Sequence, residues 1–239
     1  MTAKDIVYEM QQQIAEVFES QNPELFDVVF EIDGKKLYAH KFRLSLISST
    51  FNSMLSDRWI SKNDAIKIES CKYDNFKEFI KFLYSGECQL SDENILTMID
   101  IAEFYQVNSF KKYCDEYLSK ITLNMENIFQ IIEASNKYSI IQMKKSIQDF
   151  ISLNFTTFVK CEGFLKADKS VIEEIFTIKS NTAFKQEELF QAVYEWAEYQ
   201  ANIKNELNNE NFNKNDAIKN EIKEFLPHFE FKKMEISFF

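Results

Sequence analysis

One stretch near the N-terminus, Asp27–Trp59, constrains the fold of this chain more than any other. Apolar side chains stand at alternate positions of Val28–Ile32, which is the period of a strand with one buried face. Asp33 and Gly34 follow at once, and this pair favours a tight hairpin turn because both residues tolerate a positive φ. Apolar residues then recur at spacings of three and four, which predicts two short helices. The stretch therefore predicts a small hairpin that leads directly into helices.

A helix is expected before this hairpin, from Asp5 to about Ser20. Its apolar residues recur at helical spacing and form one stripe. The stripe consists of Ile6, Met10, Ile14 and Val17. A stripe of this kind must be buried, and the pattern leaves open whether it packs on the chain's own core or on a second copy of the chain.

The rest of the first half is predicted to hold one brief strand and three stronger helices. The strand is expected at Ala65–Ile68, and the helices at Tyr73–Tyr84, Ile95–Tyr105 and Asn108–Ile121. Gly86 is a suitable C-terminal cap for the first of these helices, and Ser91 is a suitable N-cap for the second. The helix over Ile95–Tyr105 is apolar nearly all round, so we expect it to be central.

The second half, Asn124–Phe239, is predicted to be helical throughout. Its clearest helix is Gln186–Gln200, in which Trp196 lies on the apolar face and is expected to anchor the core. Ala201–Asp216 is rich in Asn, Glu and Lys, which indicates a solvated loop or an extended, frayed helix end.

Composition excludes several classes of function. Only 3 Gly and 2 Pro among 239 residues favour a mostly helical chain and leave little material for a phosphate-binding loop. A net charge of -10 opposes nucleic-acid binding, which depends on clustered Lys and Arg. The four cysteines are widely spaced and the chain has only two histidines, so we expect no metal site and no cofactor. No nucleophile motif is present, so the chain is predicted not to be an enzyme, and His40 is expected to be structural.

Targeting signals are also missing from the sequence. The N-terminus lacks the apolar core of a signal peptide, and no run approaches the ~18 apolar residues of a membrane span. We therefore expect a cytoplasmic protein with no membrane partner, and the nucleus as a second location.

The order of these segments resembles a known family. The elements DVVF, the turn, AHK, FNSML, FIKFLYSG and AEFYQV of the first half, with FKKYCDEYL after them, are similar in order and spacing to a BTB/POZ domain. The segments EELFQAVYEWAEYQ and EFLPHFEFKKM of the second half are similar to the BACK domain that often follows it. The resemblance implies an α+β, mostly helical fold: a BTB/POZ domain (a small sheet flanked by helices) over 1–121 and an all-α BACK-like domain over 122–239. The chain stops after the BACK-like part, so we expect no kelch propeller.

The resemblance also implies where partners bind. It implies a homodimer whose interface is formed by the stripe of the first helix together with Asp27 and Lys41, although ordinary fold-stabilising contacts are an alternative for these two. It further implies a surface for a cullin-three scaffold. That surface would consist of Phe51, Met54, Trp59, Ser61, Tyr105 and Asn108. Family members that bind a cullin often carry the motif hydrophobic-x-Glu just after the helix that holds Phe51 and Met54. Aligned on Trp59, this chain has Ser61 at the position of the Glu.

The resemblance leaves three functions open. The first is a homodimeric adaptor that brings an unidentified protein substrate to a cullin-type ubiquitin ligase. The second is a self-associating scaffold with no role in ubiquitin transfer. The third is an antagonist that dimerises with longer BTB proteins.

Overall fold

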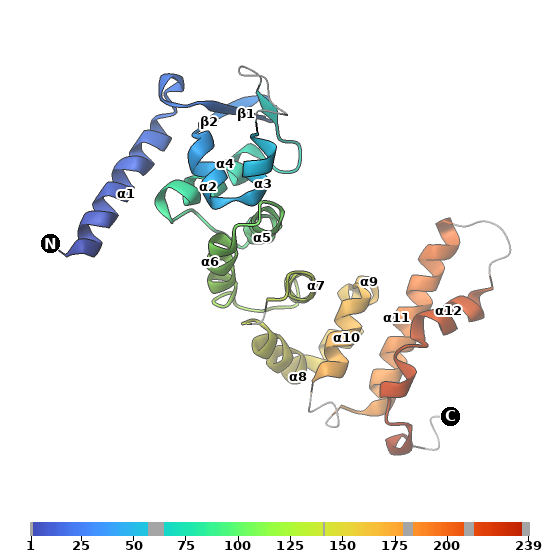
Figure 1. Ribbon diagram of the computed structural model, residues 1–239. Helices are drawn as coiled ribbons and strands as arrows, with labels where there is room; N and C mark the ends of the chain where they lie inside the picture. The colour runs from blue at the N-terminus through green and yellow to red at the C-terminus, as the bar shows by residue number, and fades with distance from the viewer. Residues whose placement is uncertain (1, 57–64, 141, 179–183, 208–212, 236–239) are drawn as a thin grey trace. The chain divides into compact units, whose positions relative to one another are not determined.

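The structure is a computed structural model that describes residues 2–56, 65–140, 142–178, 184–207 and 213–235. It divides into two compact units, Met1–Ile121 and Thr122–Phe239, called unit 1 and unit 2 below. Unit 1 combines a small sheet with helices, whereas the described residues of unit 2 form helices and short 3₁₀ turns (Figure 1). The fold is therefore α+β and mostly helical, as predicted.

The elements of unit 1 follow the predicted order. They are α1 (Ala3–Ser20), β1 (Val28–Ile32), β2 (Lys35–Ala39), α2 (Lys41–Ile47), α3 (Ser49–Met54), β3 (Ile66–Lys67), α4 (Tyr73–Ser85), α5 (Ile95–Phe104) and α6 (Asn108–Leu118). A 3₁₀ turn at Pro23–Leu25 joins α1 to β1. The start of α5 differs from the prediction, because Ser91 caps a separate turn through its hydroxyl and the helix begins four residues later.

The sheet of unit 1 has the strand order β2-β1-β3 in the described residues. Strands β1 and β2 are antiparallel and pair from Val28↔Ala39 to Ile32↔Lys35, while β3 runs parallel to β1. The turn between β1 and β2 places Asp33 at a φ of 52° and Gly34 at 73°. Both values lie in the left-handed region, so the predicted hairpin turn is confirmed.

Aromatic side chains fill the core of unit 1. Phe51 of α3 stacks on Tyr105 with ring centroids 4.3 Å apart, and Tyr105 also lies 5.2 Å from Phe79 of α4. Phe30 of β1 meets Phe76 of α4 edge to face at 5.2 Å. Each of these five rings is 0% or 1% exposed, so the cluster joins the sheet to α3, α4 and the end of α5.

His40 has the structural role that the sequence predicts. Its backbone N–H donates a hydrogen bond to the Tyr84 hydroxyl at 2.7 Å, and its ring Nδ1 lies 2.8 Å from the same oxygen. Burial raises the pKa of Tyr84 to about 12, so this hydroxyl keeps its proton at neutral pH. The contact ties the end of β2 to α4.

Unit 2 is a bundle of helices. They are α7 (Ile128–Tyr138), α8 (Lys144–Lys160), α9 (Glu162–Lys166), α10 (Lys169–Thr177), α11 (Gln186–Leu207) and α12 (Lys214–Ile222), with 3₁₀ turns at Leu226–His228 and Phe231–Lys233. Helix α10 packs on α7 and α8, and α11 packs on α9 and α12. Trp196 of α11 is 2% exposed and donates its indole N–H to the Ala167 carbonyl at 3.0 Å. This confirms the prediction that Trp196 anchors the core.

The polar segment Ala201–Asp216 begins as an extension of α11, in line with the second alternative, and also contains the start of a helix that was not predicted. Helix α11 continues to Leu207, and a separate helix, α12, begins at Lys214. Asn213 caps α12 by accepting hydrogen bonds from the backbone N–H groups of Asn215 and Asp216.

Candidate interaction surfaces

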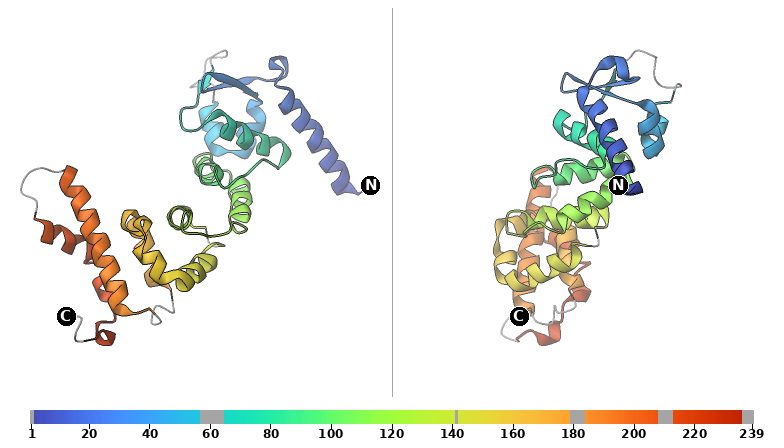
Figure 2. Two further views of the ribbon diagram at one scale, coloured as in Figure 1. Left: turned by 180° about the vertical axis from the view of Figure 1, so that it is seen from behind. Right: turned by 90° about the vertical axis from the view of Figure 1, so that its left-hand side faces the viewer.

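The first candidate surface is the apolar stripe of α1. The buried side chains of Ala15 and Phe18 pack this helix on the rest of unit 1. The Phe18 ring stacks on Tyr84 with centroids 4.6 Å apart. Glu19 adds ion pairs to Lys77 at 3.3 Å and Lys81 at 2.9 Å. These contacts lie near the C-terminal end of α1, and the helix extends along the side of unit 1 to the N-terminus (Figure 2).

The stripe itself does not face the core of its own unit. Its four predicted members are exposed by between 36% and 58%, and the neighbouring Val7 is 62% exposed. At 100° of rotation per residue, the stripe is centred about 115° around the helix from the midpoint of Ala15 and Phe18. Helix α1 therefore has one apolar face packed on unit 1 and a second that remains exposed to solvent.

Asp27 and Lys41 make the fold-stabilising contact that was the alternative to a role in a dimer. The Asp27 carboxylate accepts a hydrogen bond from the backbone N–H of Lys41 at 2.6 Å, at the first residue of α2. The carboxylate thus satisfies one of the helix's unpaired N–H groups and lies at the positive end of its dipole. A role for these two residues in a dimer stays a prediction.

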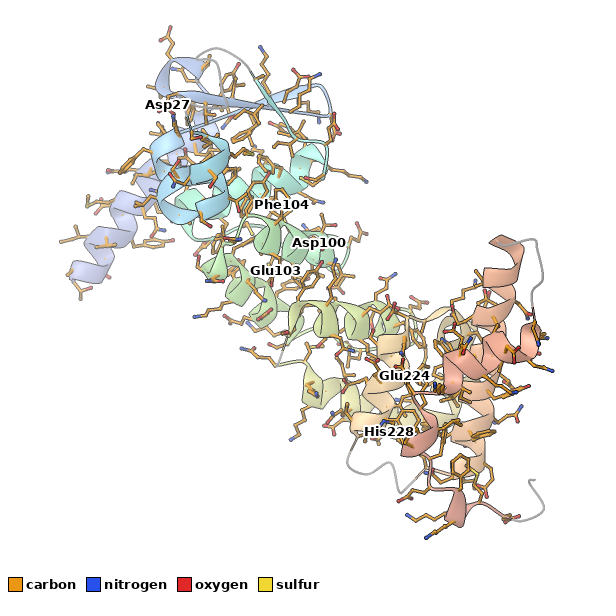
Figure 3. The ribbon with its side chains drawn as sticks, turned by 45° about the vertical axis from the view of Figure 1, so that its right-hand side comes forward. Asp27, Asp100, Glu103, Phe104, Glu224 and His228 are labelled. Carbon is orange, nitrogen blue, oxygen red and sulfur yellow. The ribbon has the colours of Figure 1, made fainter. Side chains whose placement is uncertain are left out.

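The second candidate surface is a shallow pocket of about 590 Å³ between α3 and the corner that joins α5 to α6. Its walls are partly apolar and partly polar. It is lined by Ser49, Thr50, Ser53, Met54, Phe104 and Gln106. Phe104 is 60% exposed and lies on the side of α5 that carries Asp100 and Glu103, as Figure 3 shows. We call this site the α3/α5 groove.

Hydroxyl groups at the start of α3 hold the two sides of the groove together. Ser48 donates to the Tyr105 carbonyl at 2.5 Å, and Thr50 donates to the Phe104 carbonyl at 3.0 Å. Ser48 also caps α3 by accepting from the Phe51 N–H at 3.1 Å. Because Ser48 is fully buried, its two bonds are shielded from water and keep the groove pre-formed, whereas the Thr50 bond is exposed.

Two of the residues predicted to face a cullin are instead buried in the core. Phe51 is 0% exposed and Tyr105 is 1% exposed, so neither side chain is available to a partner. The prediction that Tyr105 is a surface anchor is therefore wrong. The two rings stack on each other, and burial raises the pKa of Tyr105 well above its usual value. Their role is to support the groove from beneath.

The other predicted residues have mixed positions. Met54 lines the groove and is half-buried, whereas Asn108 is exposed at the first turn of α6 and does not line it. Trp59 and Ser61 lie outside the residues that the structure describes.

Of the residues that line the groove, only Met54 was predicted from the sequence. Phe104 was overlooked although it directly precedes Tyr105, because the segment is apolar on all sides and gives no clear outward face. The polar residues Ser49 and Thr50 could have been found from the helix-capping pattern SST, which marks the start of α3.

Charge beside the groove is predominantly acidic. Glu103, on the same helix as Phe104, forms an ion pair with Lys111 of α6, and Asp100 is exposed one turn earlier. The groove therefore offers an exposed aromatic ring next to carboxylates.

Neither surface brings metal-binding side chains together in the part of the chain that the structure describes. Among the described residues, no three His, Cys, Asp or Glu side chains lie close enough together to hold a metal ion. The four cysteines are free, and burial raises the pKa of Cys88 to about 12, which keeps it as an unreactive thiol. None of the helices in the described ranges has the length and apolar character needed to cross a membrane.

Both units contain segments that match models of known protein families. Residues 16–122 match the family model of the BTB/POZ domain, and residues 128–212 match the model called BTB And C-terminal Kelch, or BACK. The chain is 24% identical over 176 residues to Kelch-like protein 7 of Mus musculus and of Homo sapiens, and 23% identical to that of Gallus gallus. Each match covers 73% of this chain and 30% of the relative, so the chain spans less than a third of the length of these relatives.

Two solved structures of BTB domains each match about half of the chain. The BTB domain of human gigaxonin is 16% identical, with a TM-score of 0.41, over 49% of this chain and 94% of that one. The BTB domain of zebrafish PATZ1 is 18% identical, with a TM-score of 0.43, over 51% of this chain and 98% of that one.

Proposed function

We propose that this chain, which belongs to the BTB–BACK proteins, acts as a protein-interaction adaptor and carries out no catalysis itself. The family supports this directly, since its domains bind other proteins. In particular, we propose a homodimer that brings a protein substrate to a cullin-three-type ubiquitin ligase. An adaptor of this kind works by raising the local concentration of the substrate at the ligase. Its location would be the cytoplasm, with the nucleus as a second site.

The dimer would form through the exposed stripe of α1. A helix that already packs one apolar face on its own unit and leaves a second one exposed is suited to a symmetric contact with another copy. The same contact would serve a scaffold without a ubiquitin role, so dimerisation alone does not distinguish the two functions.

The cullin would bind at the α3/α5 groove, and the exposed Phe104 ring at its edge is the observation that carries this proposal. Aromatic side chains that become buried on binding contribute a large share of interface energy. The groove is also pre-formed, so binding requires little ordering of the chain.

The test of this function is the change Phe104→Ala. We expect it to weaken binding to the N-terminal region of a cullin-three scaffold by about 30-fold, because an aromatic anchor that becomes buried at an interface contributes roughly 2 kcal/mol. Isothermal titration calorimetry of the purified dimer would measure the dissociation constant.

The matched control is Ile203→Ala, which removes an apolar side chain that is 40% exposed on α11 of unit 2. This variant should bind the cullin as the unchanged protein does. If the unchanged protein forms a dimer and shows no cullin binding, the scaffold function is favoured instead. If Phe104→Ala binds normally, the α3/α5 groove is not the cullin site.

A second prediction concerns the departure from the family motif at Ser61. Ser61→Glu restores the carboxylate that cullin-binding relatives often carry, and we expect it to tighten cullin binding by about tenfold, since a charged contact at an interface contributes roughly 1–3 kcal/mol. The same calorimetric titration would measure the gain. Ser61→Gln, which is similar in size to Glu and uncharged, should give much less, and an equal gain from both variants would show that charge is not the cause.

A further inference from the structure

We infer that unit 2 carries a binding pocket for an arginine side chain presented by a partner protein. The pocket has a volume of about 330 Å³ and lies between α10 and the turn that follows α12. It is lined by Glu173, Phe176, Thr177, Glu224, Phe225 and His228. Figure 3 labels Glu224 and His228, which both come from the segment after α12.

Aromatic rings form the walls of this pocket. Phe176 of α10 lies 5.7 Å from Phe225 in a stacked arrangement, and its centroid is 5.4 Å from the His228 ring. Phe229 is not part of the lining and is only 6% exposed. Its ring meets the Phe176 ring edge to face, with centroids 5.2 Å apart. The rings are therefore held in place by packing, and they present aromatic surface to a ligand without rearranging.

Two carboxylates, those of Glu224 and Glu173, lie at the rim of this pocket. Glu224 forms an ion pair with Lys169, whose ammonium also lies 5.7 Å from the Phe225 centroid. The hydrogen bond to Glu224 raises the pKa of Lys169, and the negative charges of the nearby Glu173 and Glu221 raise it further. Lys169 is thus a cation from the chain itself, held at the edge of the pocket by one carboxylate and one aromatic face.

The second rim carboxylate, Glu173, acts on the same Lys169 ammonium as Glu224 but forms no ion pair of its own in the part of the chain that the structure describes. Glu173 is exposed on α10, and no ion pair or hydrogen bond holds its side chain among the residues that the structure describes. The charge that remains is negative, which favours a cationic group from outside and disfavours a phosphate or a carboxylate.

The combination of aromatic walls and a carboxylate favours arginine over the other cationic side chain. A guanidinium is planar, stacks on aromatic faces and donates paired hydrogen bonds to a carboxylate, whereas an ammonium is a compact and strongly hydrated charge. The Glu173 carboxylate of α10 supplies acceptors for such donors. The Thr177 hydroxyl one helical turn later is held by the chain itself, since it accepts from Gln148 Nε2 at 3.2 Å and donates to Glu174.

This inference goes beyond the proposed adaptor function and does not depend on it. It requires neither a dimer nor a cullin, because every lining residue belongs to unit 2 of a single chain. It predicts that a partner contacts unit 2 through an exposed arginine.

The experiment uses the full chain and three short peptides that differ at one position. The peptides are acetyl-Gly-Ser-X-Ser-Gly-amide with arginine, lysine or citrulline at X, and citrulline is the uncharged counterpart of arginine. We expect the arginine peptide to shift the NMR signals of the His228 and Phe176 rings in a saturable way, with a dissociation constant of about 1 mM. The lysine peptide should bind about threefold more weakly, as expected for a weaker stacking interaction, and citrulline should not saturate.

Two variants test the assignment to this pocket. Glu173→Gln and Phe176→Leu should each weaken binding of the arginine peptide by about threefold, in line with the small energies of exposed contacts. Glu126→Gln, which removes one exposed carboxylate elsewhere in unit 2, is the control and should leave binding unchanged. The inference is overturned if citrulline binds as well as arginine does, or if the shifts spread over the acidic surface and the control weakens binding equally.

Discussion

Ile14→Asp is expected to convert the proposed dimer to a monomer while unit 1 stays folded. The side chain of Ile14 is 39% exposed in the single chain, so the change places a carboxylate in solvent in the monomer but in an apolar contact in the dimer. Because a symmetric dimer carries the change twice, at roughly 2 kcal/mol or more for each copy, the dissociation constant should rise by at least about a thousandfold. Sedimentation velocity across a range of protein concentrations would measure it.

Gln12→Asp is the matched control, since it introduces the same carboxylate on the same helix. Position 12 lies about 155° around the helix from the centre of the stripe, so a carboxylate there should leave the dimer intact. Circular dichroism must show the same helical content for both variants. A dimer that survives Ile14→Asp would mean that the stripe of α1 is not the interface, and the exposed apolar residues Phe42 and Leu46 of α2 would become the next candidates.

Local chemistry made several features of both units predictable from the sequence. The Asp33-Gly34 turn was predictable because a two-residue hairpin needs positive φ at both positions, and few residue pairs tolerate that. Gly86 was predictable as the end of α4 for a similar reason, and it has a φ of 81° there. Trp196 was predictable as a core residue because it recurs with other apolar residues on one face of a long helix.

The direction in which an apolar side chain points was harder to predict. Helix α5 reads ILTMIDIAEF and is apolar on nearly every side, so periodicity gave no reason to prefer either Phe104 or Tyr105 as the exposed ring. Only the packing of α3 against the end of α5 decides it: Tyr105 turns inward onto Phe51, and Phe104 is left outside. The stripe of α1 was ambiguous in the same way, because periodicity shows that a face is apolar but not what covers it.

These two adjacent aromatic residues give the second prediction with a large effect. Tyr105→Ala should lower the free energy of unfolding by about 3–5 kcal/mol, because it removes a buried ring from a close-packed cluster and leaves a cavity. The ring is 1% exposed and lies 4.3 Å from Phe51, 5.2 Å from Phe79 and 5.7 Å from Phe76. Such a loss is a large fraction of the roughly 5–15 kcal/mol by which a domain is stable. Chemical denaturation with guanidinium, followed by circular dichroism, would measure it.

Phe104→Ala is the control one residue away, and the pair separates stability from binding. Phe104 is 60% exposed, so its removal should change the free energy of unfolding by less than about 1 kcal/mol while it weakens the cullin complex. Tyr105→Ala should weaken that complex only to the extent that it unfolds the groove, so its binding loss should diminish at low temperature or with a stabilising osmolyte, whereas that of Phe104→Ala should not. If Tyr105→Ala proves as stable as the unchanged protein and still loses cullin binding, the ring contacts the partner directly and its assignment to the core would have to be abandoned.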